Sequence, residues 1–193
     1  MSLRKQQDLL VRLLTDESMR RSFSLDPNGV GTTHGLNSPE IADLENIIPD
    51  ELAHFAESLI RKRCNEVEKI LPLTTRELGT VFESTFQQFA NSYNPVSTKK
   101  HIEDALEFCV FLLRSRVDLA VRETAKYEQA KLQFYFGGKR VVFRRLRHDV
   151  DSSGNRPQNA NEVLRSRYCL WVRLFKAQRY WVWSFYKPVT KLT

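Results

Sequence analysis

The sequence lacks the segments and the cysteine patterns that mark membrane proteins and disulfide-rich secreted proteins. Its 193 residues contain no run of about 18 apolar residues, which excludes a transmembrane helix. The N-terminal residues lack the apolar core of a signal peptide, and we therefore expect a cytoplasmic protein. The three cysteines, Cys64, Cys109 and Cys169, lie far apart and cannot form a disulfide framework.

Motifs for catalysis and metal binding are absent as well. The sequence has no Cys-x-x-Cys, His-x-His, Gly-x-Ser-x-Gly or His-Glu-x-x-His pattern, and no phosphate-binding Gly-Lys-Ser/Thr. Its four histidines are scattered, and no two of them have the spacing of metal ligands on a helix. We therefore predict a protein that is not an enzyme on its own and that holds no metal or cofactor.

Positive charge and aromatic residues gather at the C-terminal end of the chain. The formal net charge of +7 divides into −3 for residues 1–133 (17 Lys+Arg, 20 Asp+Glu) and +10 for residues 134–193 (13 Lys+Arg, 3 Asp+Glu). The second segment also holds 12 of the 21 aromatic residues, including all three Trp. Such a shift indicates two structural units and predicts that the second attracts an anionic partner. The alternative is that these cations form only the solvated face of a small sheet.

The first 133 residues have the pattern of a bundle of six or seven short helices. Apolar residues recur there at three- and four-residue spacing. Pro72 ends a long helix because proline cannot continue it, and residues 26–35 are predicted to form a loop. We expect helices over residues 3–14, from Asp16, from Ser38, from Pro49 to Ile70, from Thr74 through Phe89, from Ser97 or Thr98, and from Asp118 to Leu132.

From residue 134 onward the pattern changes to that of strands. Residues 140–150 are rich in β-branched and aromatic residues, which favours a strand. Residues 167–174 and 179–186 alternate with a period of two and are predicted to pair as an antiparallel hairpin. The sequence thus predicts an α+β fold. A helical bundle over residues 1–133 is followed by a small antiparallel β unit over residues 134–193 that packs on the helices.

Candidate binding residues lie in this β unit, because Arg and Trp are enriched at interfaces. Neighbouring strand residues face opposite sides of a sheet, so at least one of Arg144, Arg145 and Arg147 must face away from the covered side. Trp181 and Trp183 share one face of their strand and form either a surface patch or part of the core. The residues predicted to bind a partner, a peptide or an anion are Arg144, Arg145, Arg147, Arg167, Trp171, Arg173, Arg179, Trp181 and Trp183.

A series of short segments before the basic β unit carries a family resemblance. The segments are Gln7…Leu10…Leu13-Leu14, Arg20-Arg21-Ser22-Phe23, Gly35-Leu36, Leu52…Phe55-Ala56…Leu59…Lys62-Arg63, Leu71-Pro72…Leu78-Gly79…Phe82, Phe108…Leu112-Leu113 and Ala125-Lys126-Tyr127-Glu128. In this order they resemble a bacterial family described as DNA-binding domains, which includes the HvfC-type partners of multinuclear iron-dependent oxidases. The resemblance implies a helical bundle joined to a β domain. It also implies a non-catalytic protein that helps to present a ribosomally made precursor peptide to an oxidase.

Two functions follow as expectations. The first is an accessory protein whose small sheet binds an extended, acidic precursor peptide by strand addition. The second is a DNA-binding transcriptional regulator, as the family description implies. The positive charge lies in the β unit, and no helix has a clear recognition face rich in Arg, Asn and Gln, which disfavours DNA. RNA binding by aromatic residues of the sheet is a third alternative, for which the sequence has no ribonucleoprotein motif.

Overall fold

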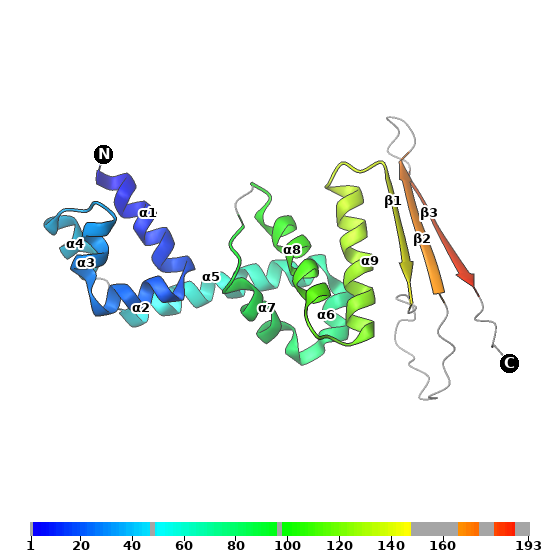
Figure 1. The fold of residues 1–193 in the computed structure, drawn as a ribbon, viewed down its shortest axis with the longest axis horizontal. Coiled ribbons are helices and arrows are strands. Elements are labelled where there is room, and N and C mark those ends of the chain that lie inside the picture. Colours follow the sequence, from blue (N-terminus) through cyan, green and yellow to red (C-terminus); the bar gives the residue numbers. More distant parts are fainter. Residues whose placement is uncertain (1, 47–48, 96–97, 148–165, 174–179, 188–193) are drawn as a thin grey trace. The chain divides into compact units, whose positions relative to one another are not determined.

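The computed structural model describes residues 2–46, 49–95, 98–147, 166–173 and 180–187 (Figure 1). In these ranges nine α-helices and one 3-10 helix precede three β-strands, so the chain has the predicted α+β fold. The helices are α1 (Ser2–Thr15), α2 (Glu17–Leu25), α3 (Pro27–Thr33), α4 (Ser38–Glu45), α5 (Pro49–Ile70), α6 (Pro72–Leu78), η1 (Gly79–Val81), α7 (Phe82–Ala90), α8 (Lys100–Arg114) and α9 (Leu119–Tyr135). The strands are β1 (Val141–Leu146), β2 (Ser166–Arg173) and β3 (Tyr180–Lys187).

The chain divides into two compact units, each built from separated parts of the sequence. One unit contains residues 1–65 and 83–94, and the other contains residues 66–82 and 95–193. The second unit therefore combines α6, α8 and α9 with all three strands. The change from helix to strand lies near the predicted composition boundary, between α9 and β1. The predicted division into a helical domain of residues 1–133 and a β domain of residues 134–193 stays a prediction.

In the first unit, α1 to α4 and the start of α5 enclose an apolar core. Asp16 begins α2 as predicted, because its side chain accepts the N–H of Met19 at 3.1 Å. Hydrogen bonds from the Ser18 hydroxyl and from this N–H hold the pKa of Asp16 below its ordinary value. The buried residues of this core are Leu9, Leu13, Phe23, Leu36, Ile41, Leu44 and Leu52.

The predicted loop over residues 26–35 is wrong, because Pro27–Thr33 form helix α3. Asp26 ends α2 and also caps α3, since its side chain accepts the N–H of Gly29 at 2.8 Å. Pro27 fits the first turn, where a helix needs no hydrogen bond from its N–H. The residues that stop one helix therefore also start the next.

Other helix starts differ from the prediction as well. Asn37, rather than Ser38, caps α4: its side chain accepts the Glu40 N–H at 3.0 Å, and the Glu40 carboxylate accepts the Asn37 N–H at 2.8 Å. Helix α6 begins at Pro72 and α8 begins at Lys100. Gly79, with a φ of 55°, ends α6 and separates it from α7, so the single helix predicted from Thr74 to Phe89 is wrong.

A buried carboxylate on α9 supplies the cap that α6 lacks in its own sequence. Glu128 accepts the N–H of Leu73 at 3.0 Å and the N–H of Thr74 at 2.9 Å. It thereby satisfies two of the donors that a helix N-terminus leaves without a partner. Burial raises the pKa of Glu128, and the hydrogen bonds from α6 oppose this shift only in part.

The three strands form one antiparallel sheet in the order β1-β2-β3, which confirms the predicted pairing of the last two strands. The turn predicted between them lies outside the described residues. Helix α9 runs beside β1 in Figure 1 and packs against the sheet. None of the helices in the described ranges has the length and apolar character needed to cross a bilayer. The core shared by α9 and the sheet consists of Ala130, Phe134, Val142, Leu146, Cys169 and Trp171.

Candidate functional site

Two of the predicted binding residues, Trp171 and Arg167, are buried. Trp171 is only 1% exposed, and its ring lies against the Tyr127 ring with 5.5 Å between the centroids. Arg167 is likewise buried in β2. Trp171 thus belongs to the core beneath the sheet, and its ring is not accessible to a partner.

Two further predicted residues, Arg144 and Arg173, tie the sheet to the end of α9. The Arg144 Nη2 donates to the side-chain oxygen of Gln133 at 3.0 Å. The Arg173 Nη2 donates to the carbonyl oxygen of Phe134 at 3.0 Å, and its guanidinium lies 5.0 Å from the centroid of the Phe134 ring. Both arginines therefore serve the packing of the helix on the sheet.

Arg145 and Arg147 are exposed, in contrast to their neighbour Arg144. The Arg145 guanidinium lies 5.7 Å from the centroid of the Tyr168 ring. This confirms that at least one arginine of the strand faces away from the covered side. Among the remaining predicted residues, Arg179 lies outside the described residues. Trp181 and Trp183 are placed in β3, but only their backbone is described.

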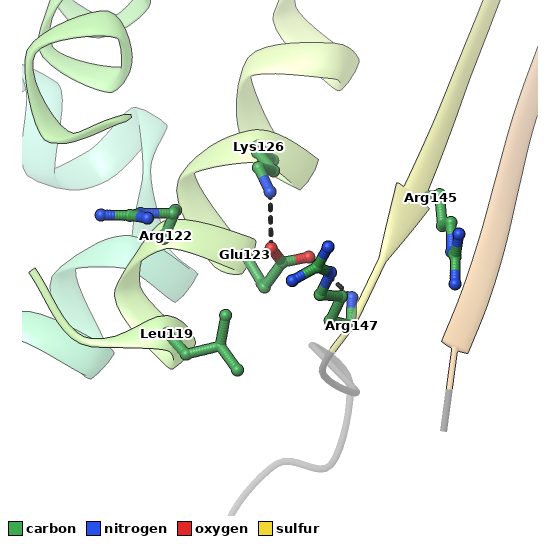
Figure 2. Close-up of a pocket in the computed structure, with 6 residues that line it drawn as sticks. All are labelled: Leu119, Arg122, Glu123, Lys126, Arg145 and Arg147. Carbon is green, nitrogen blue, oxygen red and sulfur yellow. Dashed lines mark hydrogen bonds and ion pairs between the residues drawn. The ribbon is translucent and has the colours of Figure 1, made fainter. Parts of the chain in front are cut away.

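A pocket of about 350 Å³ lies between the first half of α9 and the end of β1 (Figure 2). The Glu123 side chain is fully buried there: one carboxylate oxygen lies 2.6 Å from the Lys126 Nζ, and the other accepts the main-chain N–H of Arg147 at 2.7 Å. The Arg122 side chain turns away from Glu123 and donates to the Ser115 carbonyl at 3.2 Å. The pocket is lined by Leu119, Arg122, Glu123, Lys126, Arg145 and Arg147.

Glu123 therefore closes the edge of β1 as well as lining a pocket. Sequence reasoning missed this residue, because an acid between two basic residues of a helix has the pattern of a surface ion pair. Its spacing of three residues from Lys126 does indicate the ion pair. The hydrogen bond to Arg147, 24 residues away in the sequence, has no local signal.

The hydrogen-bond register shows which main-chain groups of β1 face its free edge. Arg173 donates its N–H to the Arg140 carbonyl at 2.8 Å, so the even-numbered residues of β1 bond to β2. The odd-numbered residues direct their N–H and C=O groups to the other side. There the Phe143 carbonyl accepts from the Arg144 Nη1 at 2.9 Å, and the Arg147 N–H donates to Glu123. Side chains thus occupy part of the β1 edge.

The opposite edge of the sheet belongs to β3. In the described ranges β3 pairs only with β2, along all eight of its residues. The same alternation directs the main-chain groups of Tyr180, Val182, Ser184 and Tyr186 away from β2. We call these outward main-chain groups the open edge. The strand has no proline and no charged residue before Lys187, although natural edge strands commonly carry such protection.

Cys109 and the possible metal ligands are two features of the described residues that could carry chemistry. Cys109 is completely buried, and burial together with the nearby charge of Glu128 raises the pKa of its thiol well above the ordinary value. The buried thiol of Cys109 is therefore part of the core and not a reactive nucleophile. No cluster of three or more His, Cys, Asp or Glu side chains within the described ranges is arranged to hold a metal ion.

One part of the helical region is similar to a known protein family. Residues 46–114 match the family described as "SCO6045-like, C-terminal domain". The match covers just over a third of the chain and includes helices α5 to α8. It ends before α9 and the basic sheet. Neither the curated proteins nor the solved structures contain a significant match to this chain.

Proposed function

We propose that this protein is a non-catalytic partner that binds an extended acidic peptide at the open edge of its sheet and helps to present it to a modifying oxidase. The observation that carries the proposal is the difference between the two edges. Side chains occupy part of the β1 edge, whereas β3 has neither proline nor a charged residue before Lys187, its last residue. A strand added there would gain main-chain hydrogen bonds from the open edge.

The positive charge of residues 134–193 favours an acidic peptide as the ligand. Residues 134–193 carry 13 Lys+Arg and only 3 Asp+Glu, and these acids are Asp149, Asp151 and Glu162. The three described strands contain neither Asp nor Glu. An acidic peptide would therefore meet no repulsion from carboxylates of the strands. The oxidase in this proposal comes from the resemblance to HvfC-type partners, and a neighbouring oxidase gene beside a short Cys-containing precursor gene would support it.

Proline at Ser184 tests strand addition at the open edge. The Ser184 N–H faces outward, so Ser184→Pro removes one edge donor without removing a hydrogen bond to β2. The matched control, Ser184→Ala, keeps the N–H. An array of acidic peptides should bind the alanine variant as it binds the parent chain. Every peptide that binds the parent chain should bind the proline variant about tenfold more weakly. This difference corresponds to the loss of one hydrogen bond.

Two results would overturn this function. The first is equal peptide affinity of the two Ser184 variants, provided that circular dichroism shows both to be folded. The second concerns duplex DNA titrated beside the peptides. Tight DNA binding that fades steeply with salt, without any selection among peptides, would favour the DNA-binding alternative.

A further inference from the structure

On the side of the sheet opposite α9, most residue positions of the three strands are apolar. The register places nine positions on this side, three from each strand. An antiparallel sheet that faces water on one side normally shows polar residues there. We call this surface the outer face; its positions are Val141, Phe143 and Arg145 of β1, Tyr168, Leu170 and Val172 of β2, and Trp181, Trp183 and Phe185 of β3.

The described side chains show that this surface is open at β1 and ordered by ring contacts. Val141 is 57% exposed and Phe143 is 55% exposed. The Phe143 ring stacks on the Tyr168 ring with 6.0 Å between the centroids and 18° between the planes. The guanidinium of Arg145 lies over the same Tyr168 ring. An exposed apolar patch of this kind, with a cation at its border, is typical of an interaction surface.

We propose that the outer face is a docking surface for an apolar protein segment flanked by carboxylates. Charge complementarity carries the choice of partner. The outer face holds Arg145, and the chain continues beyond it with the exposed Arg147, while no carboxylate belongs to the three strands. An apolar centre would cover Val141 and Phe143, and flanking acids would meet these arginines.

The outer face fits two other occupants less well. A second copy of the chain would present the same outer face, and the three strands contain no carboxylate, so Arg145 would find no acidic partner on it. A single-stranded nucleic acid would need rings for each base and cations for the phosphates. On the outer face, however, Val141 pairs with Val172, and Leu170 is the next position of β2 on the same side, so aliphatic residues interrupt the rings. Arg145 is the one cation among the described side chains of this face.

This inference rests on the proposed function only in that the partner is a protein. The proposed function places a peptide at the open edge of β3, whereas this inference concerns the outer face. Strand addition at β3 depends on main-chain hydrogen bonds, whereas docking on the outer face depends on side chains. Methylation of alternate main-chain nitrogens in a peptide should therefore abolish binding at the open edge and spare binding at the outer face. The two proposals can thus fail independently.

The test uses the full chain and three defined probes. The first is a synthetic peptide with a Leu- and Phe-rich centre and with Asp and Glu at both ends, methylated on alternate nitrogens. The second has the same centre between lysines, and the third is oligothymidylate. The acid-flanked peptide should bind the parent chain, and the double variant Val141→Thr/Phe143→Gln should bind it about tenfold more weakly. Phe136→Gln, equally exposed at the end of α9, is the matched control and should bind as the parent does.

A charge reversal keeps the test decisive if the double variant does not fold. Arg145→Glu should weaken binding of the acid-flanked peptide severalfold and improve binding of the lysine-flanked one. Equal binding of the acid-flanked peptide by the parent, the double variant and the charge reversal would overturn the proposal. So would binding of oligothymidylate alone. A parent chain that sediments as a dimer while the double variant sediments as a monomer would assign the outer face to a second copy instead.

Discussion

Glu123 of α9 accepts the main-chain N–H of Arg147, just beyond the end of β1, with 2.7 Å between nitrogen and oxygen. The other oxygen of the same carboxylate pairs with Lys126 on the helix at 2.6 Å. One fully buried side chain therefore fixes the last part of β1 against α9 and occupies an edge donor of the sheet. The two edges of the sheet differ partly because of this residue.

Replacing Glu123 by Ala should destabilise the second unit. The change leaves the Arg147 N–H and the Lys126 ammonium without their acceptor, but Lys126 is 34% exposed and can reach water. We therefore expect a loss of about 2 kcal/mol in the free energy of unfolding, the usual effect of one unsatisfied buried donor. Urea denaturation followed by circular dichroism measures it. Glu68→Ala on the exposed side of α5 is the control, and an equal loss in both variants would contradict the role of Glu123.

The helical pattern and the strand alternation were sufficient to predict the α+β fold, because both periodicities are local properties of the sequence. The helix starts were less predictable, since a cap depends on side-chain geometry. Glu128 caps α6 from 55 positions further along the chain, and Glu123 closes β1 from 24 positions away. No local pattern contains such contacts.

Which of the predicted binding residues are buried and which are exposed also depends on contacts between distant parts of the chain. Composition alone placed Trp171, Arg144 and Arg145 in one group, because all three are residue types enriched at interfaces. The strand alternation already assigns Arg145 and Arg144 to opposite faces. Only the position of α9 decides which face is covered, and it places Trp171 in the core.

The raised pKa of Glu128 predicts a pH dependence of stability. The ordinary value for this carboxyl is 4.5, and the folded chain holds the proton more tightly than the unfolded chain does. The resulting stabilisation is fully present below pH 4.5 and is lost as the pH rises through the higher folded-state pKa. Glu128→Gln has no such titration. The stability of the parent chain should therefore fall relative to this variant as the pH rises.

Urea denaturation of both chains from about pH 4 to about pH 7 measures this difference. Glu68→Gln carries the same change on an exposed side chain and should show no comparable effect. If the difference in free energy between the parent and Glu128→Gln stays constant over the range, burial does not control the ionisation of Glu128.

The two faces of the sheet should respond differently to truncation of an aromatic ring. Trp171→Ala removes a buried ring and should lower the free energy of unfolding by about 3–5 kcal/mol. Phe143→Ala removes a ring that is 55% exposed and should change it by less than about 1 kcal/mol. Circular dichroism is the suitable measurement, because tryptophan fluorescence changes with the first variant. Similar losses in both variants would mean that Phe143 is covered in solution.

Arg145 and Arg147 are exposed, whereas Arg144 is bonded to α9, so substitutions of the two kinds should affect peptide binding and stability differently. Replacing Arg145 and Arg147 by Gln should weaken the binding of an acidic peptide and reduce its dependence on salt. The stability should stay within about 0.5 kcal/mol of the parent, because exposed charges contribute little. Arg144→Gln should do the opposite: loss of its hydrogen bonds to Gln133 and Phe143 destabilises the chain by about 1 kcal/mol, while the salt dependence of binding is retained. Peptide titrations at two salt concentrations, beside urea denaturation of each variant, distinguish these outcomes. If the double variant binds the peptide with the affinity and salt dependence of the parent, the exposed arginines form only a solvated surface and the peptide is held elsewhere.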